Sequence, residues 1–200
     1  MTVADVPEAR PGPLMRAALA FQHAVDRLNE VAGGLSRWFV LATIVVGLAN
    51  TVLRYIGRLT GRQLTSNTWV EMQWNLYSMI FILGFGYILK HGVNVRVDFW
   101  FTNQPRRRKL RIDLVGHIIS LVPFTVMGIW ISQSAVRTSW TLRERSPNAG
   151  GLPLYPIKTM ILVALVLLFL QSLAEIVKVV AELRGIAAEH EEPEAPIRIE

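Results

Sequence analysis

The chain has 200 residues, 52% of them hydrophobic, with no cysteine and a formal charge of +6. The lack of cysteine excludes a disulfide framework and thiolate chemistry. Four segments of 16, 18, 23 and 16 residues carry no formal charge. A helix that crosses a bilayer needs roughly 20 mostly apolar residues. These segments therefore predict an all-α integral membrane protein with four transmembrane helices. The alternative is four buried helices of a soluble protein, but the rest of the chain is too short to cover them.

The N-terminal region divides into two parts before the first charge-free segment. Residues 1–13 hold three prolines and predict a disordered cap. Residues 14–35 carry apolar side chains at spacings of three and four, which predicts an amphipathic helix. The apolar positions are Leu14, Ala18, Phe21, Val25 and Leu28. We expect this helix to lie on the cytoplasmic membrane surface, with Gly33 and Gly34 forming a turn into the first membrane helix. A short coiled-coil seam is the alternative.

The first two membrane helices are expected at about 36–54 and 69–89. Small and polar residues line one side of the first helix, and polar stripes in a bilayer face protein rather than lipid. These residues are Gly47, Asn50, Thr51 and Arg54. Glu71 opens the second helix at a similar depth to Arg54, so the two are expected to form an ion pair. A proton or ion relay through Glu71 is the functional alternative. Gly84 and Gly86 are expected to permit close helix contact.

The remaining elements follow after a basic loop. Arg96 and Asp98 are expected to tie this inner loop together, near an interfacial aromatic stretch. The third helix is expected at 112–136, with a kink at Pro123, and the fourth at 158–178. Between them lies a loop that contains three prolines and two glycines from Arg143 to Pro156. The four helices make up a membrane domain over 36–180, and residues 181–200 form an acidic cytoplasmic tail.

Basic residues predict the orientation, because loops rich in Lys and Arg stay on the cytoplasmic side. The two terminal regions and the loop between the second and third helices hold 14 of the 21 Lys and Arg residues. Both termini are therefore expected in the cytoplasm. The cluster at Arg106–Arg111 could also suit a nucleic acid, but topology and anionic membrane lipids already account for it. We expect lipids, and no nucleic acid, as partners.

Motifs for catalysis or cofactor binding are not evident in the sequence. No phosphate-binding loop, nucleophile elbow or metal-ligand spacing is present. A haem anchor needs two axial ligands within the bundle, and His117 is the one candidate in the predicted membrane helices. No inverted pair of broken hydrophobic segments predicts a transport site. We expect a non-enzymatic subunit without cofactor. The alternatives are a membrane anchor for a haem or quinone enzyme and an independent four-helix channel.

Several stretches together resemble one protein family. They are Trp69–Tyr87, Lys90-His-Gly-Val-Asn-Val-Arg-Val-Asp98, Glu144-Arg-Ser-Pro-Asn-Ala-Gly-Gly-Leu-Pro153 and Tyr155-Pro-Ile-Lys158 ahead of Gln171. Over roughly 36–180 the chain resembles the small membrane subunit of tripartite ATP-independent periplasmic (TRAP) transporters. Asn94 stands where that family usually has His. The loop at 144–153 looks like the branch often labelled mannitol or chloroaromatic.

The resemblance implies a function that depends on partners. In such systems a soluble periplasmic protein captures a carboxylate-bearing solute, and a large membrane permease subunit carries the solute and sodium sites and moves like an elevator. The small subunit would brace the large one in the bacterial inner membrane and hold no substrate site. Candidate subunit-interface residues are Asn50, Arg54, Glu71, Trp74, Gly84, Gly86, Arg96, Asp98 and Gln171. Candidate contacts for the periplasmic protein are Arg143, Arg145 and Lys158.

Overall fold

The computed structural model describes residues 12–93 and 104–186, and these form a helical bundle. The elements are α1 (Pro13–Thr60), α2 (Asn67–Lys90), α4 (Arg106–Gly116), the π-helical turn η1 (His117–Leu121), α5 (Val122–Thr141) and α6 (Tyr155–Leu183). Because α4, η1 and α5 follow one another without a gap, they make one span of 36 residues. Four helical spans are long and apolar enough to cross a membrane. The predicted all-α fold with four such helices is confirmed, and each helix extends beyond its predicted range.

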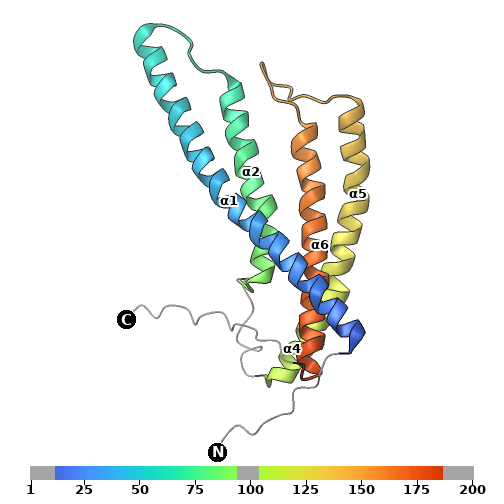
Figure 1. Cartoon of the computed structure of the whole chain (residues 1–200). Helices are drawn as coiled ribbons and strands as arrows, with labels where there is room; N and C mark the ends of the chain where they lie inside the picture. Colours follow the sequence, from blue (N-terminus) through green and yellow to red (C-terminus); the bar gives the residue numbers. More distant parts are fainter. Residues whose placement is uncertain (1–11, 94–103, 187–200) are drawn as a thin grey trace, which may run out of the picture.

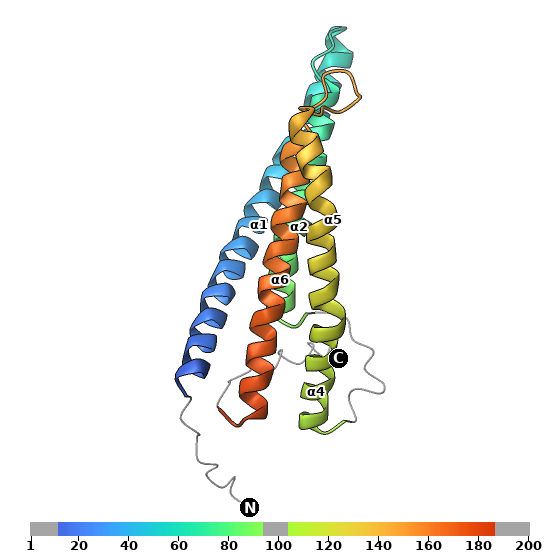
Figure 2. The same ribbon diagram turned by 90° about the vertical axis from the view of Figure 1, so that its right-hand side faces the viewer.

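The helices run lengthwise through an elongated molecule with two distinct ends (Figure 1). We call the end that holds residues 61–66 and 142–154 the loop end, and the opposite end, where α1 begins and α6 finishes, the terminal end. Helix α6 packs against α1, α2 and α5. Figure 2 shows α1 and α5 on opposite sides of α6. Helix α6 is thus the central element of the bundle.

Small side chains explain why α6 can occupy the centre. Ala174 and Ala181 are completely buried, and Ala164 is nearly so. Short side chains let neighbouring backbones approach closely, which is how helices associate where the surrounding lipid is as apolar as the helices themselves. On α5, Gly128 serves the same purpose, since a Cβ atom there would lie 3.2 Å from the Leu165 side chain.

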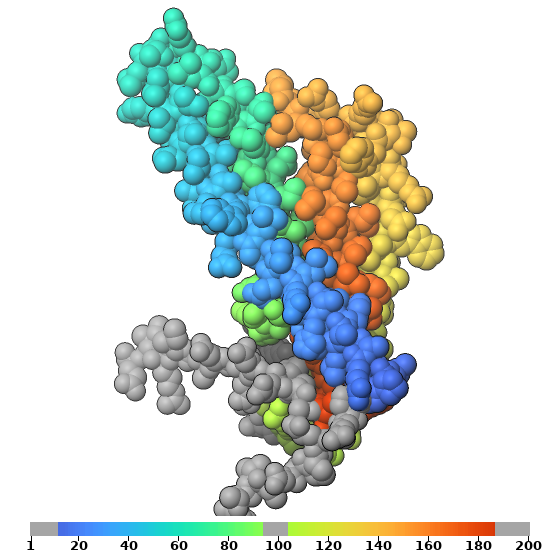
Figure 3. Space-filling model, viewed as in Figure 1, coloured from blue at the N-terminus to red at the C-terminus, as the bar shows by residue number. Residues whose placement is uncertain are grey.

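Helix α1 is continuous through residues where a turn was predicted. It runs for 48 residues, or about 72 Å at 1.5 Å per residue. Figure 3 shows it passing obliquely over α6. The expected turn at Gly33 and Gly34 is wrong. A Cβ atom on Gly33 would stand 2.3 Å from the ring of Tyr87, so this glycine permits close packing against α2 rather than a change of direction.

The first half of α1 also turns a different face inward from the one predicted. Of the expected apolar stripe, Val25 is buried, but Leu14 is 86% and Leu28 is 46% exposed. The buried positions of this half are Gln22, Val25, Asn29 and Ala32. The inward face is therefore partly polar, and much of the apolar stripe faces outward.

The irregularity expected at Pro123 takes the form of a π-helical turn. Proline has no backbone N–H and cannot bond to the carbonyl group four residues earlier. The turn η1 covers His117–Leu121 and ends two residues before the proline. The helical path widens at that point and then continues as α5 to Thr141. The third span is thus one helix with a local defect.

Candidate functional site

At the loop end, the carboxylate of Glu71 holds the 142–154 loop against α2. The Glu71 residue is 7% exposed. Its Oε2 accepts a hydrogen bond from the backbone N–H of Leu152 at 2.7 Å. Its Oε1 accepts hydrogen bonds from Asn148 Nδ2 at 2.8 Å, from Asn67 Nδ2 at 3.3 Å and from Ser146 Oγ. One carboxylate thereby fixes groups at both ends of the 146–152 segment.

Further contacts fix the shape of this loop. Thr68 Oγ1 on α2 donates to the carbonyl oxygen of Gly150 over 2.7 Å. Gly150 has a φ of 72°, a left-handed conformation that glycine adopts without strain. Across the loop, the N–H of Ser146 donates to the Leu152 carbonyl oxygen at 3.0 Å. The loop is therefore closed on itself and attached to α2 at two points.

The loop also connects to the start of α6. Lys158 forms an ion pair with Glu144. The hydrogen bond from Lys158 holds the pKa of the Glu144 carboxyl below its ordinary value of 4.5. Nearby, Trp140 Nε1 donates to Thr159 Oγ1 over 2.8 Å. The rings of Trp140 and Tyr155 lie 4.5 Å apart, centre to centre. These contacts join the end of α5 to the start of α6.

The expected ion pair between Arg54 and Glu71 is absent. Donors from the loop and from Asn67 reach both oxygens of Glu71, and no ion pair is formed between the two residues. Arg54 is exposed near the end of α1, where it lines a shallow pocket together with Arg58 and Arg62. The partners of Glu71 include a backbone N–H, which no side-chain pattern displays. The Ser, Asn and Gly residues of the loop were the sequence feature that could have indicated hydrogen bonds to α2.

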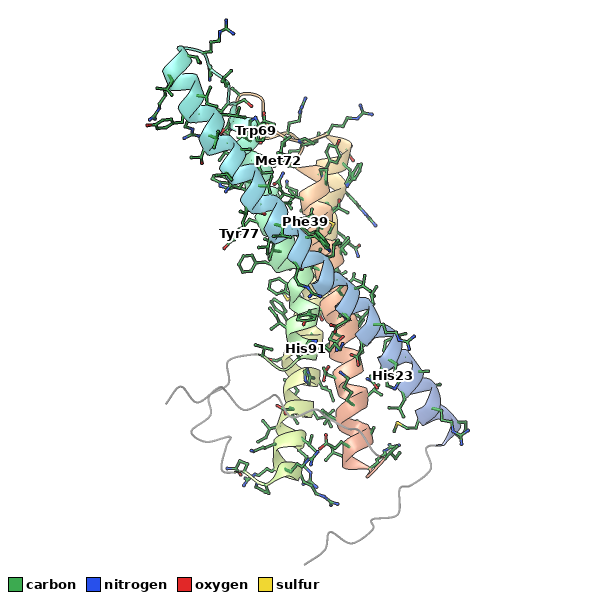
Figure 4. All side chains as sticks on the ribbon, turned by 60° about the vertical axis from the view of Figure 1, so that its left-hand side comes forward. His23, Phe39, Trp69, Met72, Tyr77 and His91 are labelled. Carbon is green, nitrogen blue, oxygen red and sulfur yellow. The ribbon has the colours of Figure 1, made fainter. Side chains whose placement is uncertain are left out.

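Other candidates from the sequence take separate places at the loop end. Arg143 and Arg145 are exposed on the loop, whereas Lys158 is engaged with Glu144. Trp74 on α2 is 66% exposed. Figure 4 shows Trp69 near the loop end of α2, with Tyr77 pointing away from the bundle.

At the other end of the bundle, a second polar cluster joins α1 to α6. Gln171 is completely buried at its centre. Its Oε1 accepts from Asn29 Nδ2 at 2.8 Å, and its Nε2 donates to Asp26 Oδ1 at 2.9 Å and to Glu175 Oε1 at 2.8 Å. Lys178 lies between the two carboxylates, 3.1 Å from Asp26 and 2.7 Å from Glu175. We call Asp26, Asn29, Gln171, Glu175 and Lys178 the inner polar cluster.

Sequence reasoning found Gln171 but missed its partners on α1. A usable signal was present, because every seventh residue of α1 is small or polar over most of its length. These residues are Gln22, Asn29, Ser36, Thr43, Asn50 and Gly57. A repeat of seven places successive residues on nearly the same side of a helix. The predicted boundary at residue 35 divided this repeat between two elements and concealed it.

The small residues of α1 and α2 make contacts of different kinds. A Cβ atom on Gly86 would lie 1.9 Å from Asn29 Oδ1, so the inner polar cluster requires glycine there. A Cβ on Gly84 would meet only Ile88 of its own helix, at 3.9 Å. A Cβ on Gly47 would lie 2.8 Å from Gln73 Nε2. Asn50 is buried between helices, whereas Thr51 is exposed and bonds to its own helix.

Helices α1 and α2 are also joined by ionic contacts of Glu30 with Lys90 and His91. Glu30 accepts hydrogen bonds from Lys90 and pairs with His91 Nε2 at 3.1 Å. Figure 4 shows His91 at the terminal end of α2. Arg96 and Asp98, which were expected to tie the inner loop together, and Asn94 lie outside the described residues.

The two clusters share one chemical character. Carboxylates and amides in them bind groups from other elements of the same chain. Among residues 12–93 and 104–186, no group of three or more His, Cys, Asp or Glu side chains is placed to hold a metal ion. What the arrangement does is fix the helices and the 142–154 loop relative to one another.

Comparison with known proteins bears on the role of such a bundle. The family model described as "Tripartite ATP-independent periplasmic transporters, DctQ component" matches residues 43–182. The chain belongs to this family. The match covers α2, the third span and nearly all of α6, and it includes Glu71 and Gln171. The DctQ family is a transporter component family rather than an enzyme family. No curated protein and no solved structure matches the chain. The chain is thus the small subunit of a TRAP transporter.

Proposed function

We propose that this DctQ-family chain is a scaffold, which braces the large permease subunit of a sodium-coupled, binding-protein-dependent transporter in the bacterial inner membrane. The observation that carries the proposal is the complete burial of Gln171 among polar partners from two helices. Breaking a buried polar network leaves desolvated groups without partners, which is costly, so such a network holds its helices in one arrangement. A subunit that keeps one shape suits the support of a partner that moves.

The proposal includes an orientation, with the loop end in the periplasm. Two thirds of the Lys and Arg residues, 14 of 21, lie in the terminal regions and in the loop between the second and third spans, which adjoin the other end of the bundle. Regions rich in Lys and Arg stay on the cytoplasmic side, which supports this orientation. The chain has no native cysteine, so single cysteines can report on each side. Asn148→Cys should react with an impermeant maleimide added to intact cells, and Gly185→Cys should react only after the membrane is opened. Reversed labelling would contradict the orientation.

The periplasmic solute-binding protein is proposed to contact the exposed arginines of the 142–154 loop. Arg143 and Arg145 are exposed, and basic side chains accelerate encounter with an acidic surface. Charge reversal at both positions should slow uptake at limiting binding protein and leave membrane assembly unchanged. Arg62→Glu serves as a control, because Arg62 is also exposed at the loop end but belongs to the 61–66 loop. An unchanged dependence on binding-protein concentration would place the contact elsewhere.

The transported solute is proposed to be an organic compound that bears a carboxylate. This proposal, like the sodium coupling and the mannitol or chloroaromatic branch, is supported by the resemblance of the 69–98 and 144–158 stretches to the family. The chain reconstituted alone, with a sodium gradient and loaded binding protein, should give no uptake. Addition of the large subunit should produce uptake that depends on sodium. Accumulation of solute by this chain alone would overturn the scaffold and favour an independent transporter.

A further inference from the structure

One stripe on the exposed surface of the third span has an unusual composition for a surface against lipid, and exposed apolar residues such as Ile119, Phe124 and Ile131 lie beside it. Seven residues recur along it at alternating spacings of three and four, and each is exposed. They are Ser120, Pro123, Met127, Trp130, Ser134, Arg137 and Thr141. This spacing is that of a seam along which one helix packs against another. The opposite face of α5 is already used, since Thr125, Val136 and Ser139 are buried.

The exposed face of α1 provides an internal comparison. Between Arg37 and Arg54, its exposed large side chains are Trp38 and a set of aliphatic residues. The aliphatic residues are Val40, Leu41, Ile44, Val45, Leu48 and Val52. Aliphatic side chains are what a lipid-facing surface requires, whereas small residues, Ser and Thr are enriched where membrane helices meet. Helices α1 and α5 lie on opposite sides of α6 (Figure 2).

The depth of the α5 face makes contact with lipid unfavourable. The charge-free stretch of this span runs from Leu114 to Val136 and is centred on Thr125. At 1.5 Å per residue, Trp130 lies about 8 Å and Gln133 about 12 Å from that centre, inside a hydrocarbon layer of about 15 Å per side. Trp130 is 79% exposed, yet tryptophan in membrane proteins prefers the interface to the hydrocarbon interior.

Two polar side chains at or beside this face have no partner in the part of the chain that the structure describes. Gln133 and Arg137 stand one turn apart, both exposed, and neither side chain makes a hydrogen bond or an ion pair there. Lipid tails offer no hydrogen-bonding groups, so an amide in hydrocarbon costs several kcal/mol by general estimates, about 2–7. By contrast, Ser134 and Thr141 satisfy their hydroxyl groups on their own helix. Gln133, which lies inside the hydrocarbon layer, therefore calls for a protein acceptor.

We propose that the face of α5 from Ser120 to Thr141 is the surface on which the large permease subunit docks. The docking element is a transmembrane helix that fits around the small residues and offers a carboxylate or a free carbonyl oxygen to Gln133 and Arg137. Trp130 is the central anchor, since a large exposed aromatic residue beside small ones contributes strongly when a partner buries it. This inference rests on the proposed function, because it names the face that the partner would use.

The test uses single cysteines in a chain that has none of its own. A nitroxide spin label is attached at Ser134→Cys on the α5 face or at Leu48→Cys on the aliphatic face of α1. Both labels should be mobile and accessible to dissolved oxygen when the chain is alone in nanodiscs. With the large subunit of its own transporter added, the Ser134 label should lose most of its oxygen accessibility. The Leu48 label should not change.

A label at Ser134 could itself block docking, so a second measurement accompanies the first. Gln133→Leu and Ser134→Trp should each reduce copurification of the large subunit about tenfold, the effect of roughly 1.4 kcal/mol at an interface. Leu48→Trp and Val45→Leu, on the α1 face, should leave copurification unchanged. Thermal unfolding of the isolated chain should be the same for all four variants, which separates a docking defect from a folding defect.

Each outcome has a distinct meaning. If a complex forms while Ser134 stays accessible and Leu48 becomes protected, the docking face is wrong although the subunit role stands. If Ser134 is protected in the chain alone and this protection increases with concentration, the face binds a second copy of this chain. If the unmodified chain forms no complex with the large subunit, the proposed function itself fails.

Discussion

Asn29 on α1 donates a hydrogen bond to Gln171 on α6 over 2.8 Å, and both side chains are completely buried. The two residues are 142 positions apart in the chain. Their contact therefore joins the beginning of the fold to its end. Because Gln171 also donates to Asp26 and Glu175, the orientation of one amide decides the partners of three other side chains.

The first prediction concerns this amide. Gln171→Leu should lower the free energy of unfolding in detergent by about 2–4 kcal/mol, since the buried Asn29 and Glu175 and the partly buried Asp26 each lose a partner. Combining it with Asn29→Leu should restore part of the loss, because removal of both partners leaves fewer unsatisfied groups. The measurement is thermal or denaturant unfolding of the unmodified chain and the three variants. A double variant that is as unstable as the sum of the single variants would contradict the coupling.

The second prediction compares two glycines of α2 that lie two residues apart in the sequence. Gly86→Ala should destabilise the bundle by about 1–3 kcal/mol, because its methyl group would overlap Asn29 and force a shift of α1. Gly84→Ala should be neutral or slightly stabilising, since alanine favours helix more than glycine and the nearest atom is 3.9 Å away. Equal effects of both substitutions on the melting temperature would show that the close contact at Gly86 does not determine the stability of the bundle.

The third prediction concerns the attachment of the 142–154 loop. Glu71→Leu removes the acceptor for Leu152, Asn148 and Ser146, so the loop should detach. Tryptic cleavage after Arg145 should then accelerate by about tenfold or more, which corresponds to a loss of about 1.4 kcal/mol. Arg54→Gln should leave the cleavage rate unchanged. A further variant, Glu71→Gln, should also be cleaved faster. If adding Arg54→Gln to it restored the slow cleavage, the two side chains would have to interact, which they do not do in the structure.

The fourth prediction is a pH dependence at the same end of the bundle. The pKa of Glu144 is lowered by its contact with Lys158. A carboxyl with a lowered pKa in the folded state stabilises that state above its ordinary pKa of 4.5, and the contribution disappears as the pH falls through the lowered pKa. Hydrogen exchange of the 142–154 loop should therefore accelerate, beyond the intrinsic pH effect, as the pH falls below that ordinary value. Glu144→Gln should reduce this dependence, and an unchanged dependence in the variant would assign it to another carboxylate of the loop end, such as Glu71, which also holds the loop.

Sequence patterns predicted the four spans well because charge-free length is a direct requirement of the bilayer. The glycines at residues 33 and 34 misled the prediction, since glycine serves both turns and close helix contacts and only the presence of Tyr87 decides between them. Glu71 was recognised as important, but its partner was not, because Leu152 contributes a backbone N–H. The inner polar cluster escaped for another reason: Asp26 and Gln171 meet only after α1 and α6 are placed side by side.

The uninterrupted course of α1 has a consequence for the bilayer itself. Its charge-free part between Arg37 and Arg54 has 16 residues, about 24 Å of helix, against a hydrocarbon thickness of about 30 Å. Because α1 crosses α6 obliquely (Figure 1), the height that it spans is smaller still. The third span, with 23 charge-free residues, is longer than the average core. We therefore expect the lipid layer around the isolated chain to be thinner beside α1 than beside α5, so that the chain imposes a gradient of membrane thickness around its own perimeter.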